Sequence, residues 1–212
     1  IFSNYVDEGY DVVHISLGAS LSVTHQSSKL AAAEFEGRVH VVDSCNLSTG
    51  TGLLVIKAAE LIEQGKSAEE VAQAVSEMVH KSHASFVIDK LDFLAAGGRC
   101  SAVALLGANL LGIKPCIEVS NEDGSLSVGK KYRGKLSKVL SQYVNEKLSE
   151  CENPYRKRAF LVHAGISQET IDELYKLIDE KNCFDEIIIS RASCTISSHC
   201  GPDTMGILFM EN

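Results

Sequence analysis

Residues 11–24 read DVVHISLGASLSVT, and this stretch sets the expected fold. Its beginning, residues 11–15, is short, apolar and β-branched, which is typical of a buried strand. A loop rich in small and hydroxyl side chains follows. A helical pattern then runs from Thr24 to Glu36, with Gly37 as its expected stop. Strand, loop and helix in this order predict the start of a β-α-β unit, in which helices pack on a parallel sheet.

The same alternation continues along the chain. A second strand is predicted at residues 38–42, and a helix at residues 50–64, which Gly65 closes. Residues 67–70, Ser-Ala-Glu-Glu, have the form of a capping box, in which a serine hydroxyl and a glutamate each satisfy a helix-end amide. We expect the helix that follows to run to His83. This β-α-β-α-α order indicates a parallel sheet covered by helices.

The pattern changes near residue 84. Turn residues 121–124, Asn-Glu-Asp-Gly, separate strands expected at 114–119 and 125–131, which predicts an antiparallel hairpin. The other expected elements are strands at 86–88, 159–163, 186–190 and 205–210, and helices at 102–111, 135–148 and 168–181. We therefore predict the α/β fold class with two lobes. Residues 1–84 form a parallel-sheet α/β/α lobe, and residues 85–212 form an α+β lobe with a mostly antiparallel sheet.

Composition excludes several classes of protein. The 212 residues include 20 Lys and Arg against 28 Asp and Glu, a net charge of −8. An acidic chain without a basic stripe argues against a nucleic-acid partner and against attraction to an anionic bilayer. No apolar run approaches the roughly 18 residues that span a bilayer, so we expect no stable membrane insertion. With no Trp and only 6% aromatic residues, the core is expected to be aliphatic.

Seven cysteines are an odd number, and none lies in a Cys-x-x-Cys spacing. This argues against a disulfide framework and against a structural zinc site. Cys194 and Cys200 flank His199, but no second ligand pair is spaced to complete a metal site. We expect reduced thiols in a cytoplasmic protein that holds no metal.

The first candidate site is the loop of residues 16–24. It leaves the carboxyl end of a buried strand and enters a helix, and α/β sheets bind ligands at such strand ends. Its hydroxyls and the free helix amides can hold an anion without a basic side chain. The alternative is a simple helix cap with a solvated loop. The loop lacks the Gly-Lys-Ser/Thr end of a P-loop.

Three further segments are candidates for anion contacts. In residues 96–101, Ala-Gly-Gly-Arg-Cys-Ser, the glycines permit close backbone approach, and Arg99 can bind a carboxylate or phosphate. The alternative there is a tight turn with a surface arginine. Residues 130–135, Lys-Lys-Tyr-Arg-Gly-Lys, form the one basic cluster, which a solvated charge run would also explain. Residues 195–202 place His199 in a short polar loop before the last strand.

Common catalytic motifs are absent: there is no G-x-S-x-G, no H-E-x-x-H, and no G-x-G-x-x-G after a strand. A hydrolase site can be assembled from Ser22, His199 and Asp43, but nothing in the spacing selects these residues. A hydrolase or phosphotransferase that uses Ser22 and His199 is therefore an alternative function. A plain interaction module with an empty cleft is another.

Segments in order along the chain resemble the DegV family of fatty-acid-binding proteins. Residues 17–27, LGASLSVTHQS, are similar to the family's serine-rich loop, L-S-S-x-L-S-G-T-Y-Q-S. Asp43-Ser44 and the glycine-led segment 50–55 are similar to the family's D-S segment and the helix after it.

The later segments extend the resemblance over nearly the whole chain. The most specific are residues 91–101 and 110–115, which are similar to L-x-x-L-x-x-G-G-R-I-S and L-L-x-I-K-P. Residues 130–134 look like the family's K-x-R-G, and residues 198–206 resemble its closing T-H-x-G-P-G-x-x-G.

The resemblance implies two α/β lobes with the long acyl chain of a fatty acid buried between them, and no cofactor. It implies that hydroxyls and amides of the serine-rich loop bind the carboxylate. The residues expected to bind the fatty acid are Gly18, Ala19, Ser20, Ser22, Thr24, Arg99 and His199.

The resemblance also implies a protein partner. Relatives present the bound fatty acid to a separate fatty-acid kinase, which phosphorylates the carboxylate to an acyl phosphate. Arg133, in the K-x-R-G position, and His199, in the T-H-x-G position, are expected to matter for that step. No residue of this chain is expected to be catalytic.

The sequence departs from the family pattern at several positions. Gly18 and Ala19 stand where two serines are usual, Val23 replaces a glycine, His25 an aromatic residue, and Ala96 a lysine. An upstream Thr-Ser-Gln-Pro segment of the family does not occur in these residues. We therefore expect the first lobe to lack the N-terminal part of the family's first domain.

Overall fold

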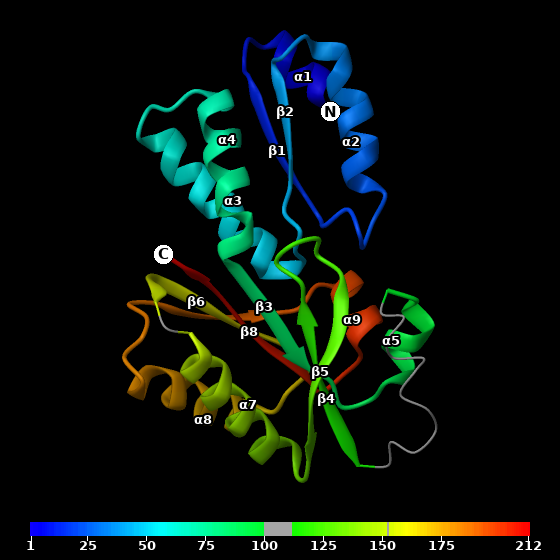
Figure 1. Ribbon diagram of the computed structural model, residues 1–212, viewed down its shortest axis with the longest axis vertical. Helices are drawn as coiled ribbons and strands as arrows, with labels where there is room; N and C mark the ends of the chain where they lie inside the picture. The colour runs from blue at the N-terminus through cyan, green and yellow to red at the C-terminus, as the bar shows by residue number, and fades with distance from the viewer. Residues whose placement is uncertain (100–111, 152) are drawn as a thin grey trace. The chain divides into compact units, whose positions relative to one another are not determined.

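The computed structural model describes residues 1–99, 112–151 and 153–212 (Figure 1). The chain divides into two compact units. The first unit comprises Ile1–Ser82 and Ser120–Ser125, and the second comprises His83–Val119 and Leu126–Asn212. We predicted a boundary near residue 84 and placed the turn 120–125 in the second lobe, whereas the structure groups this turn with the first unit.

Hydrogen bonds explain the grouping of that turn. His80 Nδ1 donates to the Asn121 carbonyl at 2.6 Å, and the Asn121 side-chain amide donates to the His80 carbonyl at 3.1 Å. A Cβ on Gly124 would lie 2.8 Å from the carbonyl carbon of Cys45, so only glycine fits there.

The first unit is built on a two-stranded parallel sheet, as predicted. Val12 lies opposite Val39, and Ser16 lies opposite Asp43. Its elements are α1 (Phe2–Asp7), β1 (Val12–Ser16), α2 (Thr24–Ala32), η1 (Ala33–Phe35), β2 (Val39–Asp43), α3 (Ser48–Glu63), α4 (Ala68–Met78) and η2 (Val79–Lys81).

The sequence predicted the beginning of α4 correctly but not its end. The capping box of α4 is confirmed: Ser67 Oγ accepts from the Glu70 amide at 3.3 Å, and Glu70 accepts from the Ser67 amide at 2.8 Å. The prediction that this helix reaches His83 is wrong, because η2 follows Met78 and the next strand begins at Ser82.

The second unit contains a mixed sheet of strand order β5-β4-β3-β8-β6-β7. β6 and β7 are parallel, whereas β3–β4, β4–β5 and β6–β8 are antiparallel, which confirms the mostly antiparallel lobe. Its elements are β3 (Ser82–Val87), α5 (Asp92–Gly97), β4 (Ile113–Val119), β5 (Leu126–Arg133), α7 (Leu136–Glu150), β6 (Pro154–Ala164), α8 (Gln168–Glu180), β7 (Ile187–Arg191), α9 (Cys194–Cys200) and β8 (Thr204–Glu211).

One prediction about this unit is wrong, and another concerns residues that the structure does not describe. The segment around His199 is the helix α9 and not a polar loop, because Ser193 caps it by accepting from the Ile196 amide. The predicted helix at 102–111 and Cys100 and Ser101 lie outside the described residues.

The six-stranded sheet is apolar on both faces. On one face, Leu161 and Ile207 pack in the cluster that contains Leu140 of α7 and Leu174 of α8. The other face belongs to a second cluster, whose buried members are Ile88, Leu94, Ile117, Ala164 and Cys200. Side chains at its margin are only partly buried; they include Phe86, Leu126, Val128 and Ile196. Among the described residues, α5 contributes Leu94 and α9 contributes Cys200 to this second cluster.

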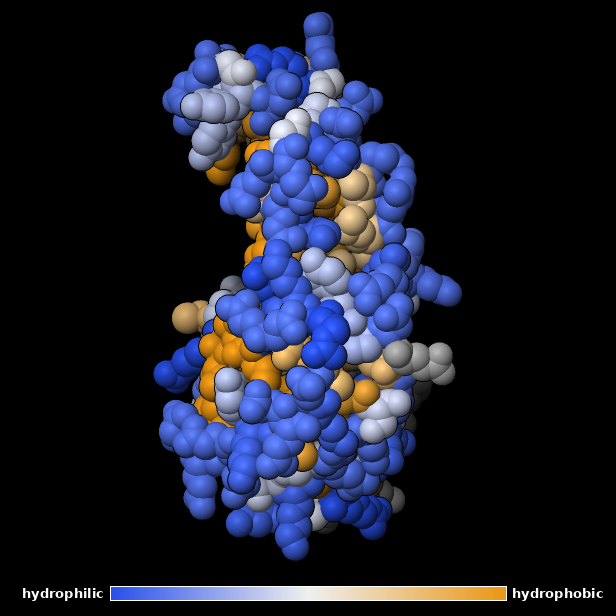
Figure 2. All heavy atoms as spheres, turned by 90° about the vertical axis from the view of Figure 1, so that its left-hand side faces the viewer, coloured by the Kyte–Doolittle hydropathy of each residue, from blue (hydrophilic) through white to orange (hydrophobic). Residues whose placement is uncertain are grey.

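The face shown in Figure 2 is mainly hydrophilic, with hydrophobic areas between the hydrophilic ones. Ile62 and Ile189 are among the large apolar side chains that remain exposed. In the described segments, no helix has the length and apolar character that crossing a bilayer requires.

Glu146 of α7 makes a polar contact with β5 that can be tested. Burial opposes its ionisation, but hydrogen bonds from Lys130 (2.6 Å), Gln142 (2.9 Å) and Tyr132 (2.8 Å) outweigh burial and hold the pKa of Glu146 at about 2. A depressed folded-state pKa means that this stabilisation is complete above the unfolded pKa and is lost as the pH falls.

We therefore expect Glu146→Gln to lower Tm by about 2–4 °C at pH 7. The difference from the wild type should shrink as the pH falls from about 4.5 toward 2. Thermal unfolding followed by circular dichroism measures it, with Glu173→Gln, an exposed position on α8, as the control. A pH-independent difference would contradict this role of the carboxylate.

Candidate functional site

The loop between β1 and α2, residues 17–24, is here called the hydroxyl loop. Leu21 is buried and anchors it. The Gly18 amide donates to the Asn46 carbonyl at 2.9 Å, and the Gly18 carbonyl accepts from the Leu21 and Ser22 amides. A Cβ on Gly18 would lie 3.1 Å from the Asn46 nitrogen. The loop therefore folds tightly over the segment that follows β2.

Asp43, at the end of β2, fixes the next residue of the loop. Its carboxylate accepts from the Ala19 amide at 3.2 and 3.3 Å and from the Cys45 amide at 2.9 Å. We predicted that the amides of Gly18 and Ala19 bind a ligand, but in the structure both already donate to protein oxygens. Burial, Asp43 and Asp123 raise the pKa of the Cys45 thiol, so the cysteine beside this carboxylate is protonated at neutral pH.

The predicted hydroxyls of the loop are at least partly accessible, and two of them are in contact. Ser20 and Thr24 are exposed, and Ser22 is half-buried. Ser22 Oγ lies 2.7 Å from Thr24 Oγ1 and accepts from the Thr24 amide at 3.2 Å. The first turn of α2 has no acidic residue. This arrangement can donate hydrogen bonds to an anion at the start of a helix.

Asn46 supports the loop by accepting a hydrogen bond from the Gly18 amide, and it was not predicted from the sequence. Its side chain is buried and donates to the Ser82 carbonyl at 2.9 Å. A Cβ on Gly50 would overlap with its Oδ1, so glycine is required there. An asparagine just after the Asp43-Ser44 pair at a strand end was the available signal.

Two histidines join α2 to β1 and were also missed as a pair. Ser16 Oγ donates to the Val42 carbonyl at 3.2 Å, so the His25 Nδ1 proton is the one donated to Ser16 at 2.9 Å. His14 Nε2 lies 3.0 Å from Ser28 Oγ. Burial and the nearby His25 lower the pKa of His14. Both rings thus hold the helix that the hydroxyl loop enters.

In the second unit, Arg99 and His199 meet at one residue, Gly97. Arg99 Nη1 donates to the Gly97 carbonyl at 2.7 Å. The Nδ1 atom of His199 is buried against Gly97, close to where a Cβ would stand. One turn earlier, Phe93 packs on Gly201 in the same way, with 2.6 Å between its ring and a Cβ built there. Residues 96–99, the described part of the predicted segment 96–101, and the predicted segment 195–202 therefore come together as the junction of α5 and α9.

Arg133 lies elsewhere in the second unit. It ends β5, opposite Ile113 of β4, and its side chain is exposed. In the described ranges, no hydrogen bond or ion pair joins it to Arg99 or His199. Lys130, in the same basic cluster, is paired with Glu146 at 2.6 Å.

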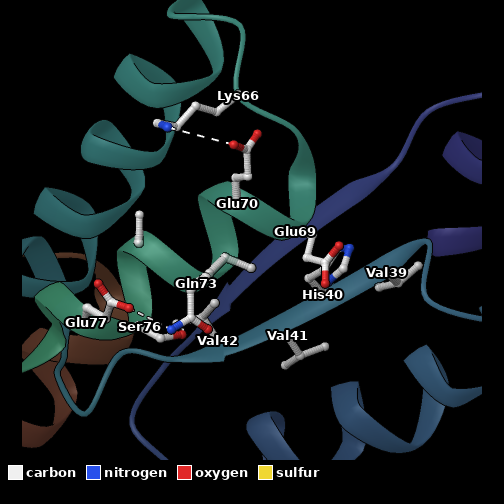
Figure 3. A pocket seen from close by; sticks show the side chains of 12 residues that line it. Val39, His40, Val41, Val42, Lys66, Glu69, Glu70, Gln73, Ser76 and Glu77 are labelled. Carbon is white, nitrogen blue, oxygen red and sulfur yellow. Dashed lines mark hydrogen bonds and ion pairs between the residues drawn. The ribbon is translucent and has the colours of Figure 1, made fainter.

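A groove of about 750 Å³ runs between β2 and α4 (Figure 3). Both polar and apolar side chains line it, with Lys66 paired to Glu70 and Gln73 donating to Glu77. None of the predicted site residues lines this groove. Within the described parts of the chain, no three His, Cys, Asp or Glu side chains gather as ligands for a metal.

These features define a class of structure: an α/β protein with a hydroxyl loop on a parallel sheet and an arginine–histidine junction on a mixed sheet. The chain belongs to the DegV family, because the family model described as "Uncharacterised protein, DegV family" matches residues 1–212. This confirms the resemblance stated above.

Individual relatives agree with this assignment. A DegV domain-containing protein of Clostridium acetobutylicum is 32% identical over 214 residues, which cover 99% of this chain and 73% of that protein. A solved structure of a DegV family protein from Thermus thermophilus, described by its fatty acid binding, matches with a TM-score of 0.89 and 28% identity over 100% of this chain and 74% of that one. The Streptococcus pneumoniae Fatty Acid Kinase (Fak) B3 protein, loaded with linoleic acid, matches with a TM-score of 0.83 and 25% identity over 98% and 74%.

Replacing Asp43 tests how the hydroxyl loop is held. We expect Asp43→Ala to lower the free energy of unfolding by about 1–3 kcal/mol, since it leaves two amides without their charged acceptor. Denaturant unfolding measures the loss, and hydrogen exchange should show faster exchange at Ala19 and Cys45. The control is Asp11→Ala, which removes an exposed ion pair with Arg38 and should cost less than about 1 kcal/mol. Unchanged exchange at Ala19 would contradict the assignment.

Proposed function

We propose that this protein binds a long-chain fatty acid and presents its carboxylate to a separate fatty-acid kinase. It acts as a carrier and not as an enzyme. The observation that supports this most is the pair of hydroxyls of Ser22 and Thr24, with the exposed Ser20 in the same loop, in a fold similar to that of fatty-acid-binding proteins.

The acyl chain needs an apolar surface, and the second unit offers one. The sheet face that carries Ile88 and Ile117 has partly buried apolar side chains at its margin, among them Phe86 and Val128. Burial contributes about 0.8 kcal/mol per methylene, so such a face can hold a long chain without a metal or cofactor. Phe86 and Val128 are our candidates for contact with the chain.

The carboxylate is assigned to hydroxyls and not to the loop amides. The Asp43 carboxylate already accepts the hydrogen bond of the Ala19 amide, and the negative charge of Asp43 would repel a second carboxylate at that place. Ser20, Ser22 and Thr24 are reachable and can donate without neutralising the ligand's charge. A carboxylate held in this way keeps an oxygen accessible to a phosphoryl donor.

The phosphoryl-transfer step belongs to the kinase in this proposal. A carboxylate oxygen attacks the terminal phosphorus of the kinase's nucleotide, the bridging P–O bond breaks, and the nucleoside diphosphate leaves. Arg99, Arg133 and His199 supply N–H donors that suit phosphoryl oxygens. The Fak B3 protein, a fatty acid kinase component, is the relative that supports such a partner.

The alternative, an enzyme that uses Ser22 as a nucleophile, has less support. Ser22 Oγ contacts the Thr24 hydroxyl and amide, which cannot serve as a general base. The serines that do bond a histidine are Ser16, which is buried and donates to a backbone carbonyl, and Ser28, whose Oγ lies 3.0 Å from His14 Nε2. Turnover of acyl esters or acyl phosphates by the purified protein alone would favour the enzyme.

Lipid analysis tests the binding itself. We expect a fatty acid to be recovered from the denatured, purified protein by mass spectrometry, and delipidated protein to take one up. The variant Ser20→Ala/Ser22→Ala/Thr24→Val should lose affinity by about 10-fold or more, because hydrogen bonds to a charged group are removed. Ser27→Ala, an exposed serine of α2, is the control. No acyl chain and no uptake would contradict the proposal.

The kinase step predicts a separate phenotype for Arg133. Arg133→Ala should leave fatty-acid affinity within about 2-fold of the wild type but lower acyl phosphate formation with a fatty-acid kinase by about 10-fold or more. Lys138→Ala, an exposed lysine of α7, should change neither. Equal acyl phosphate formation by the Arg133 variant and the wild type would remove this residue from the proposal.

A further inference from the structure

Gly97 is a glycine for reasons of space. It is the last residue of α5, with an ordinary helical backbone, whereas Gly98 after it has φ +64° and ends the helix in the left-handed region. A Cβ added to Gly97 would meet the His199 ring at its Nδ1 atom and lie 3.3 Å from Cε1. The absence of a side chain is therefore what lets the imidazole lie against α5.

The surroundings of Nδ1 decide the tautomer of His199. This nitrogen is buried and finds no hydrogen-bond partner among the described residues. A buried N–H without an acceptor is costly, whereas an unprotonated nitrogen facing a Cα–H bond makes a weak favourable contact. The Cα–H bond that a Cβ would replace points at this nitrogen.

We infer that Gly97 is the positioning residue of the second unit's donor pair: it holds His199 as the Nε2–H tautomer and orients Arg99. Its bare Cα fixes the imidazole, and its carbonyl accepts from Arg99 Nη1 at 2.7 Å. The neutral ring thus presents an N–H at Nε2, and the guanidinium keeps its other donors. The use of these donors toward a phosphoryl or carboxylate anion rests on the proposed function, but the tautomer does not.

Imidazole NMR tests the tautomer directly. Long-range ¹H–¹⁵N spectra of labelled protein at mildly alkaline pH show which nitrogen carries the proton, and His199→Gln identifies the signals of His199. We expect Nε2 protonated and Nδ1 unprotonated in the wild type, and loss of this pattern in Gly97→Ala. Gly52→Ala is the matched control, because its added Cβ would meet only Thr49 Cβ at 4.0 Å within the helix α3. A proton on Nδ1 in the wild type, or unchanged His199 signals in Gly97→Ala, would overturn the inference.

A thermal double-mutant cycle tests the same contact when Gly97→Ala is unstable. Gly97→Ala should lower Tm by about 2–8 °C, because an overpacked methyl group displaces the ring. In a His199→Ala background the same change should cost little or nothing. If Gly97→Ala fails to fold, recovery of folding in the double variant supports the contact. An equal loss in both backgrounds, or no recovery, overturns it.

The lipid content of these samples separates this inference from the proposed function. The expected tautomer in a protein that binds no fatty acid would support the role of Gly97 and contradict the carrier function. Bound fatty acid together with an unchanged His199 spectrum in Gly97→Ala would support the carrier function and contradict the role of Gly97.

Discussion

The conformation of the hydroxyl loop depends on hydrogen bonds between two segments: the one that follows β1 and the one that follows the neighbouring parallel strand β2. Because β1 and β2 run in the same direction, the segments after Ser16 and Asp43 emerge at the same edge of the sheet. The Gly18 amide donates to the Asn46 carbonyl, and the Ala19 amide donates to the Asp43 carboxylate. These bonds turn the inner half of the loop toward the protein and leave the hydroxyls of its outer half for a ligand.

The elements that could be predicted from the sequence are those with local causes. The capping box at Ser67 and the turn before β5 are set by residues a few positions apart, and both were predicted correctly. The parallel pairing of β1 and β2 followed from the order of elements. The helix α9 was not predicted because it is short and mostly polar, so no apolar periodicity marked it. Its capping residue, Ser193, was the remaining signal.

The candidate site could be predicted only in part, because its geometry comes from residues distant in sequence. The serine-rich pattern indicated Ser20, Ser22 and Thr24; in the structure Ser20 and Thr24 are exposed and Ser22 is half-buried. It could not show that Asp43 accepts a hydrogen bond from the Ala19 amide and that Asn46 accepts one from the Gly18 amide. In the second unit, Arg99 and His199 were separate candidates, and only the packing of α5 on α9 brings them to Gly97.

Fatty-acid binding through the loop hydroxyls can be followed by NMR titration of delipidated protein with a fatty acid labelled at its carboxyl carbon. Binding should shift the carboxyl resonance and perturb the amide signals of Ser20, Ser22 and Thr24, while the Ala19 amide keeps its bond to Asp43. A carboxyl resonance that stays at its free position as protein is added, with no change in the hydroxyl loop, would contradict it.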